Sequence, residues 1–133
     1  MADFRLFLPD DLGGILGEVD ESGVLTFVIA VKAESPIRGT ELFNLMVRAF
    51  GARVRAVQGV WRPGCEDSPS ANLDKVNERT AAGAPLMDAV QETWTFTRAA
   101  RLGFSRATVV AVEGTPGRYT KIDVLLEKVE EPR

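Results

Sequence analysis

Hydrophobic and polar positions alternate with a period of two in several short segments of this chain, which is typical of half-buried strands. Residues 15–19 and 24–31 are two such segments, and the Asp-Glu-Ser-Gly sequence between them favours a hairpin turn. In residues 24–31 both alternating sets of side chains are largely apolar, so we expect a strand that is central in its sheet or covered on both faces. The alternation predicts three further strands at residues 53–62, 104–112 and 119–128.

Apolar residues spaced three and four apart mark three other segments as amphipathic helices. The first spans residues 40–50 and the second residues 73–82. The third and longest runs from Pro85 to Gly103, with proline suited to its first turn and glycine suited to the position after its end. This helix would bury one face, made of Leu86, Ala89, Val90, Trp94, Phe96 and Ala100.

The predicted order of elements is ββ-α-β-α-α-ββ. Direct hairpins at both ends favour a mostly antiparallel five-stranded sheet with the helices packed on one side, which is an α+β fold. A chain of 133 residues is long enough to bury a core and is expected to form one domain, residues 1–133. We expect residues 1–12 and 129–133 to be frayed.

The composition narrows the possible chemistry. The chain has no histidine, which removes the commonest general base and metal ligand, so no metal site and no cofactor are expected. It has one cysteine, Cys65, so disulfides do not hold the fold together. No apolar run approaches the roughly 20 residues of a membrane helix, and no signal-like segment is visible. The prediction is a cytoplasmic protein, or a module delivered as part of a secreted protein, without a membrane partner.

The net charge is −3 but is distributed unevenly. Residues 1–35 carry two basic and seven acidic residues, whereas residues 36–64 carry five arginines and one glutamate. Residues 65–92 are again acidic and residues 93–121 are again basic. The basic segments either converge on one face that attracts an anion or pair with the acidic segments.

Polar side chains interrupt the apolar face of the long helix. Thr93 and Thr97 lie one turn apart near the centre of that face, and Arg101 lies one turn further on. Burying a hydroxyl costs free energy unless it finds a partner. Each threonine could bond the backbone carbonyl four residues back. Alternatively, this line of residues faces a polar cleft between the helix and the sheet.

Two strand residues could join such a cleft, because Gln58 and Thr120 are the polar members of otherwise apolar rows. Asn72 or Asn77 would add hydrogen bonds from the preceding helix. A pocket of hydroxyls, amides and cations suits an anionic ligand or nucleotide, or a developing negative charge.

The strongest candidate for a functional lysine is Lys121, beside Tyr119, although it lies on the strand face opposite Thr120. Otherwise Lys121 is a solvated strand residue. Trp61 is either a core residue or a stacking platform for a substrate.

Several short pieces of sequence, spread over about two thirds of the chain, form a recognisable pattern. They are Arg38-Gly39-Thr40-Glu41-Leu42-Phe43, Gly59-Val60-Trp61, Asn72-Leu73-Asp74-Lys75-Val76-Asn77-Glu78, Thr93-Trp94-Thr95, Leu102-Gly103-Phe104 and Gly114-Thr115-Pro116-Gly117-Arg118-Tyr119-Thr120-Lys121. From about residue 38 onward the chain thereby resembles a C-terminal module of bacterial polymorphic-toxin proteins, of the Rhs-repeat and contact-dependent-inhibition kinds.

The resemblance implies a small effector used in interbacterial competition, and many such effectors are nucleases. It favours a metal-independent ribonuclease, in which the 2′-hydroxyl of RNA attacks its own phosphate. Lys121 or Arg101 would stabilise the charge, and Thr97 and Thr120 would orient the phosphate. Candidate substrate contacts are Thr93, Thr120, Gln58, Asn72, Tyr119 and Trp61.

A second interpretation is a non-catalytic binding or immunity-like protein that recognises a cognate protein partner or a small anionic ligand. The acidic balance, the absence of histidine and the two-sided apolar strand at residues 24–31 favour it. A protein partner would then be basic and would bind through residues 1–35 or 65–92.

Overall fold

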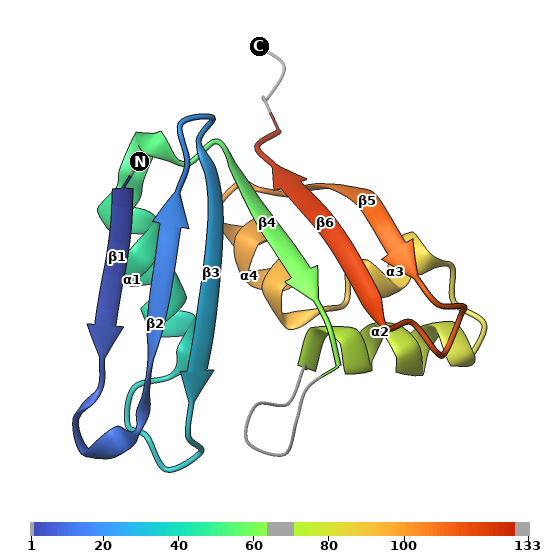
Figure 1. Ribbon diagram of the computed structural model, residues 1–133, viewed down its shortest axis with the longest axis horizontal. Coiled ribbons are helices and arrows are strands. Elements are labelled where there is room, and N and C mark those ends of the chain that lie inside the picture. The colour runs from blue at the N-terminus through green and yellow to red at the C-terminus, as the bar shows by residue number, and fades with distance from the viewer. Residues whose placement is uncertain (1, 64–70, 130–133) are drawn as a thin grey trace. The chain divides into compact units, whose positions relative to one another are not determined.

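The computed structural model describes residues 2–63 and 71–129 of the chain (Figure 1). Within it the chain forms two compact units, residues 1–56 and residues 57–133. The expectation that residues 129–133 are frayed concerns residues that, apart from Val129, lie outside the described part.

The first unit is a three-stranded antiparallel sheet with one long helix. Its strands follow each other in the order β1-β2-β3, and each pairs antiparallel with the next without a register shift. The elements are β1 (Ala2–Phe7), the short 3-10 helix η1 (Pro9–Asp11), β2 (Gly13–Val19), β3 (Val24–Val31), α1 (Gly39–Phe50) and the 3-10 helix η2 (Gly51–Arg53).

The core of the first unit lies between this sheet and α1, which runs behind the three strands in Figure 1. The alternating pattern of β3 turns Leu25, Phe27, Ile29 and Val31 toward the helix, and the apolar stripe of α1 meets them. Phe27 and Phe43 have ring centroids 5.1 Å apart, and Phe4 meets Phe50 edge-on at 6.2 Å. The predicted helix at residues 40–50 and its buried stripe are therefore confirmed.

The amino-terminal segment differs from the prediction. Residues 1–12 were expected to be frayed, but Ala2–Phe7 form β1 and pair with β2 over the whole strand. The reason lies in the alternation: Ala2, Phe4 and Leu6 point to one face, and Asp3, Arg5 and Phe7 to the other. The described part of the chain therefore has six strands, where the sequence predicted five.

The second unit is also α+β. Its strands are ordered β4-β6-β5, with β5 and β6 antiparallel and the arrow of β4 opposite to that of β6 in Figure 1. Ile122, Val124 and Leu126 of β6 are fully buried and form the centre of its core. The elements are β4 (Ala56–Trp61), α2 (Ala71–Ala81), α3 (Leu86–Val90), α4 (Trp94–Arg101), β5 (Arg106–Glu113) and β6 (Lys121–Glu127).

The long helix predicted from Pro85 to Gly103 is wrong. The segment is divided into α3 and α4, and the chain leaves the helical conformation at Thr93. The Thr93 side chain accepts a hydrogen bond from the Phe96 N–H and so acts as the N-cap of α4. The break turns Thr95 into the core, although Thr95 was not among the residues expected on the buried face.

The α+β class is confirmed, since each unit combines antiparallel strands with helices. None of the described helices combines the length and the apolar character needed to span a bilayer.

Candidate functional site

The two threonines predicted to line a cleft have local hydrogen-bond partners. The Thr93 hydroxyl donates to the Val90 carbonyl at 2.7 Å, and the Thr97 hydroxyl donates to the Trp94 carbonyl at 3.0 Å. Both bonds reach three residues back rather than the four we expected. Each hydroxyl therefore has a hydrogen-bond partner in the backbone of its own segment.

The strand residues predicted to join these threonines lie elsewhere in the second unit. Gln58 donates from Nε2 to the Asp123 carboxylate at 3.0 Å. Asp123 alternates along β6 with the buried Ile122 and Val124, so Gln58 is on the sheet face away from that core. Thr120 is exposed, and its hydroxyl donates to the Glu113 carbonyl at 3.4 Å. The structure does not bring Gln58 and Thr120 together with Thr93, which is buried among the helices.

The candidate catalytic residues are also separate. Lys121 begins β6 opposite Glu113, whereas Arg101 ends α4 and is exposed. Arg98 contacts the Thr97 hydroxyl at 2.8 Å and lies over the Trp94 ring at 4.8 Å. Partial burial, and then the neighbouring charge of Arg101, lower the pKa of Arg98 from its ordinary value. Trp61 is buried, with its indole packed over Gly59.

Helix α2 uses its polar side chains to hold distant backbone. Asn77 makes two bonds to Tyr119: its Nδ2 donates to the carbonyl at 3.0 Å, and its Oδ1 accepts from the N–H at 2.7 Å. Asn72 forms a similar pair with the hydroxyl and N–H of Thr95. The Thr80 hydroxyl accepts from the Gly117 N–H at 2.8 Å.

These contacts involve five residues of the pattern on which the toxin resemblance rests. Asn72, Asn77, Thr93, Thr95 and Tyr119 belong to that pattern, and each takes part in a hydrogen bond that fixes a helix start or a strand end. Among the described residues, no buried side-chain nitrogen or oxygen is left without a partner. These five residues therefore have structural roles, whether or not the protein is catalytic.

A different kind of surface occurs in the first unit, on the sheet side opposite α1. We call it the outer face, and its apolar centre is unusually exposed: 72% of Phe7, 69% of Val28 and 40% of Leu16 are accessible. Cover on both sides was one of the two expectations for residues 24–31, but Thr26, Val28 and Ala30 of β3 are exposed. The outer face consists of Asp3, Arg5, Phe7, Gly14, Leu16, Glu18, Thr26, Val28 and Ala30.

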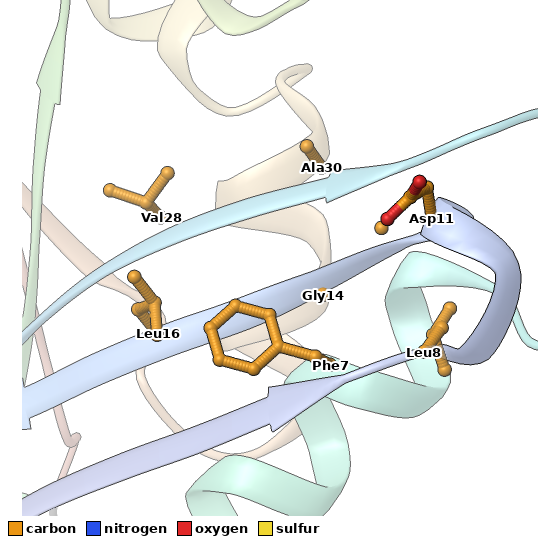
Figure 2. Close-up of a pocket in the computed structure, with 8 residues that line it drawn as sticks. Phe7, Leu8, Asp11, Gly14, Leu16, Val28 and Ala30 are labelled. Carbon is orange, nitrogen blue, oxygen red and sulfur yellow. The ribbon is translucent and has the colours of Figure 1, made fainter.

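The strand register brings these residues together in rows. Phe7 lies opposite Gly14, which lies opposite Ala30, and the next row is Arg5, Leu16 and Val28. Because Gly14 has no side chain, the first row is hollow between Phe7 and Ala30 (Figure 2). A Cβ at Gly14 would also lie only 2.5 Å from the carbonyl oxygen of Leu6, so close strand packing excludes a larger residue.

This hollow is part of an open surface depression of about 440 Å³ at one end of the sheet, which we call the cavity. Figure 2 shows Leu16 and Val28 beside one another, and the Asp11 carboxylate at the end nearest Ala30. The cavity is lined by Phe7, Leu8, Asp11, Gly13, Gly14, Leu16, Val28 and Ala30.

The turn that brings Asp11 to the cavity has an unusual backbone. Asp10 and Asp11 both have positive φ, 59° and 55°, a conformation that aspartate tolerates better than most residues. Residues held in sparsely populated backbone regions are concentrated at functional sites. The turn therefore adds a carboxylate to an otherwise apolar hollow.

The rim of the outer face is mainly acidic. Asp3 and Glu18 lie opposite each other in the row beyond Arg5 and Leu16, and Asp11 lies at the other end. Arg5 is the basic member of the outer face and forms a loose, exposed ion pair with Asp3 at 3.8 Å. An apolar centre with acidic ends is suited to binding a surface that is itself apolar and basic.

Sequence reasoning identified β3 as apolar on both faces but did not identify Phe7, Gly14 or Asp11 as its neighbours. The alternation within residues 2–7 was the available sequence signal for Phe7, and the Gly13-Gly14 pair was the signal for Gly14. Within residues 2–63 and 71–129, no group of three or more acidic or cysteine side chains is placed to hold a metal ion. No protein-family model, curated protein or solved structure matches this chain.

Proposed function

We propose that this protein is a non-catalytic binding module and that the outer face of the first unit is its binding surface. The observation that carries the proposal is the exposure of Phe7, Leu16 and Val28 on one side of a three-stranded sheet. Monomeric proteins rarely leave large side chains clustered in contact with water, and such clusters mark interaction sites. The cavity beside them offers room for an inserted side chain.

The charges indicate what kind of partner fits. Asp11 at one end and Asp3 and Glu18 at the other would meet lysine or arginine side chains, while the centre would bury apolar ones. The partner in this proposal is therefore a basic protein that presents a large apolar side chain between cations. An immunity-like or adaptor protein that covers a basic partner would need a surface of this kind.

The test is a selection of peptides from a random phage-displayed library on the immobilised chain. We expect recovered peptides to combine large apolar side chains with lysine or arginine. Val28→Lys should weaken their binding by at least about tenfold, because it places a charge in the apolar centre. Binding is measured by fluorescence polarisation with a labelled copy of each peptide.

The matched control is Val110→Lys, which introduces the same change at an exposed valine of β5 in the second unit. This variant should bind the peptides as the parent chain does. Recovery of no peptides, or of peptides that bind parent and Val28→Lys equally well, would contradict the proposal.

The ribonuclease interpretation leads to a different result and stays a prediction from the sequence. Under the binding proposal, total RNA incubated with the purified chain remains intact on a denaturing gel, and Lys121→Ala changes nothing. Discrete cleavage that is lost in Lys121→Ala and in Thr97→Val, with both variants folded, would favour the ribonuclease instead.

A further inference from the structure

Strand β1 is at the free edge of the first unit's sheet. The strand order begins with β1, and in the described part of the chain it has β2 as its neighbour on one side. An edge strand presents backbone N–H and C=O groups that can pair with another strand. Proteins usually protect such edges with a proline, a bulge or charged side chains. Strand β1 contains no proline and no register shift over Ala2–Phe7, and its charged residues are Asp3 and Arg5, of opposite sign.

The edge strand of the second unit, β5, is protected by a register shift. Strand β5 is last in the strand order, and its register with β6 shifts between Val109 and Ala111. A bulge of this kind twists an edge and interrupts its hydrogen-bonding pattern. The contrast makes β1 the edge that is prepared for pairing.

The side chains of β1 indicate which strand would fit. Asp3 and Arg5 are exposed on the same face, one on each side of Phe4. If two copies of β1 pair antiparallel about Phe4, Asp3 of each copy lies opposite Arg5 of the other. Opposite charges directly across from each other stabilise a strand pair, and the two-fold symmetry provides this pairing twice.

We propose that the protein forms a symmetric dimer in which β1 pairs with β1 of a second copy. The two three-stranded sheets then continue into one. The two-fold axis of such an extension is perpendicular to the sheet, so both outer faces lie on the same side. This proposal rests on the strand edge and does not depend on what binds the outer face.

The pairing of one six-residue strand buries little surface, so the dimer is expected to be weak and to depend on concentration. Sedimentation velocity of the full chain over a rising concentration series should show a monomer–dimer equilibrium. Asp3→Arg and Arg5→Asp each place like charges opposite each other twice, and each should weaken the dimer by at least about tenfold. Both side chains are exposed, so the variants should fold as the parent does, which far-ultraviolet circular dichroism checks.

The decisive measurement is an equimolar mixture of the two single variants. In the mixed pair every position again has an opposite charge across from it, so a heterodimer should form at concentrations where each variant alone is monomeric. Arg106→Glu and Glu113→Arg on β5 are the matched controls and should leave the dimer unchanged. A parent chain that stays monomeric throughout, single variants that dimerise as the parent does, or a mixture that stays monomeric would each overturn the proposal.

Discussion

Replacing Phe43 by alanine is expected to lower the free energy of unfolding by about 3–5 kcal/mol, the usual cost of deleting a buried aromatic ring. Phe43 is fully buried between α1 and the sheet, and its ring packs on Phe27 with centroids 5.1 Å apart. The loss removes contacts on both sides and leaves a cavity that a small sheet can fill only in part. Urea denaturation followed by far-ultraviolet circular dichroism measures the effect.

The control for this variant is Leu45→Ala, two residues away on the same helix, because Leu45 is about half exposed. Its effect should be under about 1 kcal/mol. If the two variants were equally stable, α1 would not be packed on the sheet through the Phe43 face.

The second large effect is expected for Asn77→Ala in α2. This change leaves the N–H and the carbonyl of Tyr119 without their partner, and each unsatisfied group costs about 1–3 kcal/mol, giving a loss of about 2–6 kcal/mol. Both tryptophans of the chain, Trp61 and Trp94, are in the second unit. Intrinsic fluorescence during urea denaturation therefore reports on the unit that the substitution affects.

Glu78→Ala is the matched control, since Glu78 is the next residue of α2 and is exposed. It should leave the fluorescence transition close to that of the parent. A transition for Asn77→Ala that coincides with that of Glu78→Ala would show that water replaces the bonds to Tyr119 at no cost.

The parts of the fold that were predicted correctly are those with a strong period and a clear end. Helix α1 was expected at residues 40–50 and occupies Gly39–Phe50, because its apolar stripe is regular and Gly51 ends it. The hairpin of β2 and β3 was expected for the same reason, with a turn at Asp20 to Gly23. In both cases local preference and burial favour the same structure.

The missed elements are those in which two signals conflict. Apolar spacing continues across Thr93 as if one helix ran through it, but the threonine side chain caps a new helix. The spacing alone does not reveal this, because a capped restart can preserve the same face. Strand β1 was missed because Asp3 and Arg5 gave its short segment a polar, terminal character.

The candidate site was harder to predict than the fold because it depends on register. A two-sided apolar strand usually indicates cover on both faces, and that expectation hid the exposed Val28. Only the pairing of β1, β2 and β3 shows that Phe7, Gly14 and Ala30 share a row. The spacing of these residues in the sequence does not show that they share a row. A shift of one residue in the strand register would move every side chain of a strand to the other face of the sheet.

The contacts of α2 also determine the order in which the two units can fold during synthesis. Asn77 is fixed by a residue 42 positions further along, and Thr80 by one 37 positions further along, so the second unit closes only when its last hairpin exists. The strand pairing of the first unit is complete by Val31, and its helix by Phe50. Because domains generally fold in the order in which they are made, the outer face is finished while the ribosome is still adding β5 and β6. Under the binding proposal, a partner can therefore engage a nascent chain as well as a released one.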